Sequence, residues 1–131
     1  MRASFAVCLA ACGVILVAVP VVGHHSFAAE YDANKPINLT GSVTKVEWMN
    51  PHAWFYLDVT APDGKVANWA LEMGSPNGLI REGWSRNTLT IGDVVTVEGS
   101  AAKDRPHKAN ARSVMMNGKR LFAASSQGSS Q

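Results

Sequence analysis

The most regular feature of the sequence is an alternation of apolar and polar residues along short segments that turn residues separate. Between residues 37 and 48 apolar side chains recur at every second position, which predicts a strand. The alternation changes phase near Lys45, where we expect a β-bulge. The same pattern predicts further strands at residues 53–60, 65–73, 94–99 and 109–116. Residues 119–122 are compatible with a last short strand.

Turn and capping residues divide these strands. Ala61-Pro62-Asp63-Gly64 is typical of a hairpin turn, because proline presets its φ angle and glycine accepts a positive φ. Ser75 can cap a helix whose first residue is Pro76, and we expect this short helix to reach about Glu82 and to stop at Gly83.

The predicted order is three strands, a short helix and two strands. This order favours a mainly β fold: a small five-stranded OB-like Greek-key barrel with its helix between strands 3 and 4. The alternative is another small β-barrel or sandwich, in which the helix is only a turn.

The N-terminal segment is typical of a secretory signal peptide. Met1-Arg2 carry one positive charge, residues 3–22 are uncharged and mostly apolar, and Gly23 offers a cleavage point. Three alternatives remain open. The segment could be retained as a membrane anchor, cleavage could follow Ala28 or Ala29, or the chain could be acylated at Cys12 as a lipoprotein.

Cleavage after Gly23 divides the chain into a signal peptide, an extended arm, a β domain and a disordered tail. The corresponding ranges are residues 1–23, 24–36, 37–122 and 123–131. We expect a periplasmic or secreted protein with no stable membrane span after cleavage.

Composition and charge narrow the possible functions. Both cysteines, Cys8 and Cys12, lie in the signal peptide, so the mature domain has neither a disulfide nor a thiolate. The net charge of +2 falls to +1 when Arg2 is removed, which gives no electrostatic reason to bind nucleic acid. The serines follow no nucleophile-elbow pattern and no glycine-rich phosphate loop is present. We therefore expect a binding module and not an enzyme, with an envelope protein or a small ligand as its partner.

Several blocks of the mature sequence are distinctive. They are His24-His25-Ser26-Phe27, Tyr31-Asp32, Glu47-Trp48, Asn50-Pro51-His52-Ala53-Trp54, residues 69–77, Gly92-Asp93, Ala109-Asn110-Ala111-Arg112 and Arg120-Leu121-Phe122. In these blocks the chain resembles a family of small exported bacterial proteins described as a domain of unknown function. The resemblance implies export and a single β domain, and it supplies no catalytic residue.

The histidines provide one candidate chemistry. After cleavage at Gly23 the α-amine and the imidazole of His24 can bind one metal ion together, and His52 could add a third nitrogen. Such a set suits Cu(II), which favours tetragonal nitrogen ligands. His25 offers a competing mode, and Met49 or Met73 could add soft sulfur ligands. Solvated histidines and core methionines are the alternative interpretation.

The aromatic residues provide a second candidate chemistry. A platform for a small ligand or a protein could form on one face of the barrel. The residues that would form it are Trp48, Trp54, Tyr56 and Trp69. The alternative is that at least half of these rings belong to the core or lie under the N-terminal arm.

Overall fold

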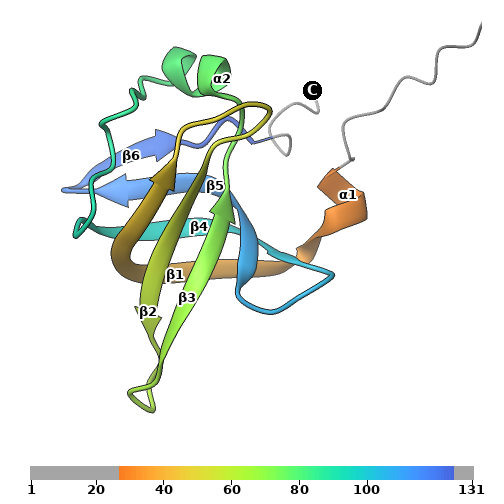
Figure 1. The fold of residues 1–131 in the computed structure, drawn as a ribbon. Helices are drawn as coiled ribbons and strands as arrows, with labels where there is room; N and C mark the ends of the chain where they lie inside the picture. Colours follow the sequence, from red (N-terminus) through yellow and green to blue (C-terminus); the bar gives the residue numbers. More distant parts are fainter. Residues whose placement is uncertain (1–26, 126–131) are drawn as a thin grey trace, which may run out of the picture.

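The computed structural model describes residues 27–125 and has a mainly β fold, as predicted (Figure 1). Within these residues it contains six strands and two short helices. In chain order they are α1 (Phe27–Glu30), β1 (Tyr31–Glu47), β2 (Trp54–Thr60), β3 (Val66–Glu72), α2 (Pro76–Arg81), β4 (Val94–Ala102), β5 (Lys108–Met116) and β6 (Lys119–Phe122).

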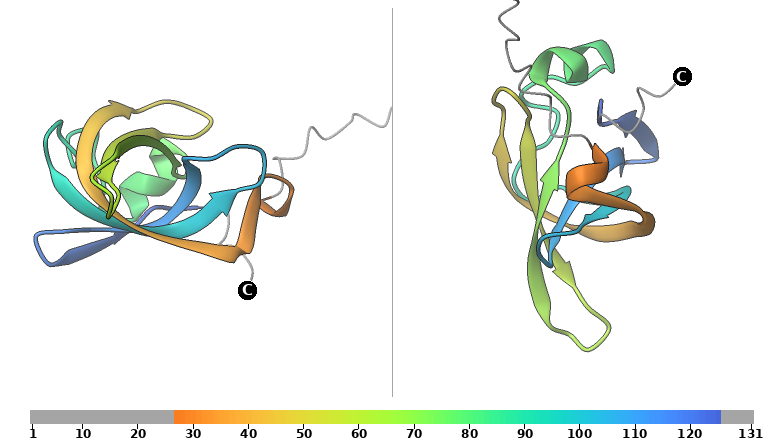
Figure 2. Two further views of the ribbon diagram at one scale, coloured as in Figure 1. Left: turned by 90° about the horizontal axis from the view of Figure 1, so that it is seen from below. Right: turned by 90° about the vertical axis from the view of Figure 1, so that its right-hand side faces the viewer.

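All six strands belong to one strongly curved sheet in the order β3-β2-β1-β4-β5-β6 (Figure 2). Neighbours in this order pair antiparallel, and β3 makes an additional parallel pairing with β5. The register of β1 on β2 shifts between Val43 and Lys45, which confirms the predicted bulge. The strand count is one more than the predicted five, because β6 forms after the turn at Asn117-Gly118.

The predicted turn and helix signals are confirmed. The side chain of Ser75 accepts a hydrogen bond from the backbone N–H of Gly78 at 3.1 Å, and α2 begins at Pro76. Past the end of α2, Gly83 has a φ of +94°, the left-handed conformation that glycine tolerates best. In the β2–β3 hairpin the N–H of Gly64 donates to the carbonyl of Ala61 at 2.9 Å.

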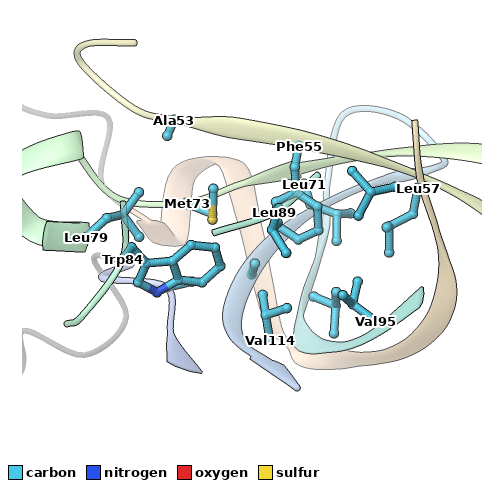
Figure 3. Packing of buried hydrophobic residues seen from close by; sticks show 14 of the residues in the cluster. Ala53, Phe55, Leu57, Leu71, Met73, Leu79, Trp84, Leu89, Val95 and Val114 are labelled. Atoms are coloured by element: carbon cyan, nitrogen blue, oxygen red, sulfur yellow. The ribbon is translucent and has the colours of Figure 1, made fainter. Parts of the chain in front are cut away.

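The concave side of the sheet holds the hydrophobic core (Figure 3). Phe55 and Leu57 of β2 and Leu71 of β3 are fully buried there. Trp84, in the connection after α2, closes one end of the core, and its indole N–H donates to the carbonyl of Phe122 at 2.9 Å. Burial of these large apolar side chains is the main source of stability for a domain without a disulfide.

The two ends of the domain differ from expectation. Residues 27–36 were expected to be an extended arm before the first strand, but Phe27–Glu30 is helical and β1 already begins at Tyr31. Backbone pairing with β4 causes this, since Tyr31 is opposite Ala102 and Pro36 is opposite Ser100. The pattern of apolar and polar side chains in residues 31–36 does not predict this backbone pairing with β4.

The beginning of the predicted disordered tail is also ordered. Ala123 is buried, its N–H donates to the carbonyl of Arg112 at 2.9 Å, and its carbonyl accepts from the N–H of Gly74 at 2.8 Å. The predicted signal peptide and residues 126–131 lie outside the described residues. Among residues 27–125, no helix has the length and apolar character needed to cross a membrane.

Candidate functional site

A row of polar residues crosses the convex face of the sheet, opposite to the core. Glu72 of β3 is paired with Trp54 of β2 and with Asn110 of β5, and Asn110 is paired with Ser100 of β4. Directly paired residues place their side chains on the same face. Glu72 is only 7% exposed and Asn110 only 2%, although this face points away from the core. A cover must therefore lie over the row.

Tyr31, at the start of β1, is part of that cover. It is 3% exposed, and its hydroxyl donates a hydrogen bond to Oε2 of Glu72. The ammonium of Lys108 lies over its ring, 5.6 Å from the centroid. Burial raises the pKa of Tyr31 well above its ordinary value, and the hydrogen bond to Glu72 and the charge of this carboxylate raise it further. Tyr31 is therefore a neutral hydrogen-bond donor at physiological pH.

Glu72 also holds His52, which lies in the connection between β1 and β2. Nδ1 of His52 is 2.5 Å from Oε1 of Glu72. A carboxylate oxygen only accepts hydrogen bonds, so Nδ1 carries the proton and, in the neutral ring, Nε2 keeps its lone pair. The His52 side chain is 37% exposed, whereas Glu72 is buried. The buried carboxylate thus orients a histidine that solvent can reach.

Helix α1 attaches the N-terminal segment to the same place. The ring of Phe27 stacks on Tyr31, with centroids 5.6 Å apart and planes 26° from parallel. Lys103 fixes the helix twice: its Nζ donates to the carbonyl of Ala28 at 2.6 Å, and its backbone N–H donates to the carbonyl of Glu30 at 2.8 Å. Residues 27–31 therefore lie beside the chain of polar contacts from Tyr31 through Glu72 to His52.

A comparison with protein families identifies the family to which this chain is related. A family model described as Family of unknown function (DUF6152) matches residues 11–111. The chain belongs to this family. No curated protein matches the sequence. In this DUF6152 protein the matched residues include Tyr31, His52, Glu72 and Asn110, so the whole polar site lies within the family match.

The predicted metal ligands of this DUF6152 protein lie in different environments. His24 and His25 are outside the described residues, three and two positions before Phe27 respectively. Met49 is exposed in the same connection as His52, whereas Met73 is buried in the core near Leu79 (Figure 3). Within residues 27–125, no three side chains of histidine, cysteine, aspartate or glutamate gather as a metal site. A metal bound by His52 needs further ligands from the preceding segment or from solvent.

The predicted aromatic face is divided by the sheet. Trp54 and Tyr56 lie on the convex face, where the ammonium of Lys45 is 5.3 Å from the centroid of the Tyr56 ring. Trp69 is paired with Leu57, so it lies on the concave side, edge-on to His107 with centroids 5.2 Å apart. Trp48 is half-buried against the core. These four rings therefore do not form one platform.

Sequence reasoning missed Tyr31, Glu72 and Asn110 as site residues. Glu72 occupies a polar position of an alternating strand, where a solvent-exposed carboxylate is ordinary. The burial of Glu72 results from the cover by Tyr31 and from the parallel pairing of β3 with β5. The available signal was that Tyr31, Glu72 and Asn110 all fall inside the distinctive sequence blocks.

Proposed function

We propose that this protein is an exported, non-enzymatic metal-binding module that takes up Cu(II) through His24 and His52. His24 supplies its α-amine and imidazole after cleavage at Gly23, and His52 supplies Nε2. Three nitrogens in this combination suit the tetragonal geometry that Cu(II) prefers. Metal carriage or buffering in the periplasm is the corresponding role.

The close contact between Nδ1 of His52 and the buried carboxylate of Glu72 is the observation that carries this proposal. Histidines that bind metals usually donate their second ring N–H to a carboxylate or a carbonyl, which fixes the tautomer and the orientation of the ring. The Nδ1–Oε1 distance of 2.5 Å and the burial of Glu72 reproduce this arrangement, with Nε2 as the remaining ligand atom.

Helix α1 supports cleavage before Phe27. Cleavage after Ala28 or Ala29 would remove Phe27 from its stack on Tyr31 and would create a new terminus inside the contacts of Lys103. A segment so closely packed on the domain belongs to the mature protein. Its retention keeps His24 and His25 within three residues of the site.

The additional pairing of β3 with β5 supports an OB-like barrel as the scaffold. Following the pairings from β1 through β2, β3, β5 and β4 returns to β1, and α2 connects β3 to β4. This is the strand order of a five-stranded Greek-key barrel to which β6 is appended. In this scaffold the β1–β2 connection with His52 and Met49 borders one end of the barrel. We assign Met73 to the core and not to the metal site.

The test uses the protein recovered from its export route. Intact mass gives its first residue, and calorimetry with electron paramagnetic resonance measures Cu(II) binding. We expect a terminus at His24 and one nitrogen-rich site. His52→Ala should weaken this site by more than the roughly 10- to 100-fold that loss of an outer partner costs. His107→Ala is the matched control, because His107 is exposed and contacts Trp69 instead.

Two results would contradict the proposal. One is a terminus beyond His25, and the other is a Cu(II) affinity that His52→Ala leaves unchanged. The alternative function, binding of a small ligand, would then be favoured by a groove of about 450 Å³. Leu39 and Val59 contribute apolar side chains to this groove, and Trp69 and His107 contribute rings.

A further inference from the structure

We infer that Asn117 is a site of spontaneous modification, at which the folded protein converts this asparagine into aspartate and isoaspartate. Asn117 and Gly118 form the turn between β5 and β6. This turn projects from the side of the domain opposite to α1 (Figure 1, Figure 2). The inference therefore goes beyond the proposed copper site and does not depend on it.

The reaction uses the backbone nitrogen of the following residue as its nucleophile. This nitrogen attacks Cγ of the asparagine, its proton passes to a base in the solvent, and ammonia leaves from the side chain, so that a cyclic succinimide remains. Water then opens the ring. Cleavage at the side-chain carbonyl gives aspartate, and cleavage at the main-chain carbonyl gives isoaspartate, in which the chain continues through Cγ. A glycine in the following position favours the attack because it has no side chain to hinder it.

The sequence contains an Asn-Gly pair twice, and at Gly118 the attacking nitrogen is accessible. Met116 pairs with Lys119, so both turn residues lie outside the ladder. No backbone hydrogen bond within residues 27–125 involves the N–H of Gly118. Both turn residues are exposed, and among the described residues only chain neighbours lie within 4 Å of the position that a Cβ on Gly118 would take.

The other pair, Asn77-Gly78, lies in the first turn of α2 and is protected. The N–H of Gly78 donates to Oγ of Ser75 at 3.1 Å. A Cβ on Gly78 would lie 3.3 Å from Cβ of Ala124 and 3.3 Å from Oγ of Ser75, so the surroundings of this residue are packed. Attack by this nitrogen would require α2 to lose the cap that begins it.

The two products should differ in their effect on β6. Isoaspartate places an additional atom, its own Cβ, in the main chain of a two-residue turn whose length sets the register of the strands. The register matters because the carbonyl of Phe122 in β6 accepts the indole N–H of Trp84 and because Ala123, the next residue, donates to Arg112. Aspartate leaves the main chain unchanged, and it tolerates the φ of 51° at this position as asparagine does.

The experiment incubates the mature protein in mildly alkaline buffer and follows both asparagines by peptide mapping with mass spectrometry. Asn117 should react at least about tenfold faster than Asn77, the factor that corresponds to one net hydrogen bond. In urea the two sites should react at similar rates, because a glycine follows each of them. Ser75→Ala removes the acceptor for Gly78, and it should accelerate the reaction at Asn77 while leaving that at Asn117 unchanged.

Similar rates at the two asparagines in the folded protein would overturn the inference, and so would an Asn117 that reacts only in urea. The effect on β6 is tested with the products, which ion exchange separates. The isoaspartate form should unfold at a lower urea concentration than the variant Asn117→Asp, which has the same charge and an unaltered main chain. Equal midpoints would refute the predicted loss of register.

Discussion

High pH should destabilise the folded domain through Tyr31, because its hydroxyl is buried against a carboxylate and resists ionisation. Tyr31 is 3% exposed and donates to Glu72. Burial, followed by the hydrogen bond and the charge of Glu72, raises its pKa well above the ordinary value of 10.0. Because the pKa of Tyr31 is higher in the folded protein than in the unfolded chain, Tyr31 makes its full contribution to the free energy of unfolding below pH 10. The contribution is lost as the pH rises, because the unfolded chain releases the proton first.

The size of this pH effect follows from the release of one proton, that of the Tyr31 hydroxyl, when the chain unfolds. Above pH 10 each pH unit lowers the free energy of unfolding by about 1.4 kcal/mol, which amounts to about 3 kcal/mol at pH 12. At neutral pH, Tyr31→Phe removes one hydrogen bond from the buried Glu72 and should cost about 1 to 3 kcal/mol. The variant has no proton to lose at this position. The free energies of unfolding of Tyr31→Phe and of the wild-type protein should therefore become equal at about pH 11 to 12.

The assay combines urea unfolding at each pH with the absorbance of tyrosinate. The chain has only two tyrosines, Tyr31 and Tyr56, so each ionisation can be assigned. The pKa of Tyr56 is also raised, first by partial burial and then by the charge of Glu47, but its ring is half-exposed and should ionise in the folded protein. Tyr56→Phe removes this step and leaves Tyr31 alone. The reasoning is refuted if Tyr31 then ionises near pH 10 while the circular dichroism stays native.

Two further predictions concern the scaffold, each measured by urea unfolding. Gly99→Ala should cost about 3 kcal/mol or more, because its Cβ would lie 1.8 Å from the backbone oxygen of Asn110. Gly64→Ala is the control, since open space surrounds it and only its φ of +85° opposes a side chain, at about 1 kcal/mol. Trp84→Phe should cost about 2 to 3 kcal/mol through the lost hydrogen bond to Phe122 and a cavity. The half-exposed Trp54→Phe should cost less than about 1 kcal/mol, and equal losses in the two tryptophan variants would contradict this account.

Local signals predicted most of the elements of the sheet. Strands with one buried face leave a period of two in the sequence, and Ser75-Pro76 marks the start of α2 through a side-chain cap that involves neighbouring residues only. The bulge near Lys45 was likewise visible as a change of phase. Each of these features is encoded within a few residues, so one sequence is sufficient to find it.

Features that depend on contacts between distant residues were missed. Residues 31–36 join β1 through backbone pairing with β4, which imposes no pattern on their side chains. Ala123 is ordered by backbone hydrogen bonds to Gly74 and Arg112, although the segment looks like the start of a polar tail. The burial of Glu72 requires the β3–β5 pairing and the cover by Tyr31 together, and the sequence around Glu72 contains neither.

The polar row under Tyr31 connects α1 to the sheet through buried polar and ionic groups, whose desolvation costs free energy. Replacing a buried ionic or polar group by apolar residues of similar size is often neutral or stabilising, so a row of valine or leucine could hold Phe27 and Tyr31 as well. Within residues 27–125, the polar row instead leaves Oδ1 of Asn110 without a hydrogen-bond partner and keeps the carboxylate of Glu72 buried. What it adds is a fixed orientation of His52, with Nδ1 held by the buried carboxylate and Nε2 available. Stability alone does not explain this arrangement, whereas the metal that we propose at Nε2 would.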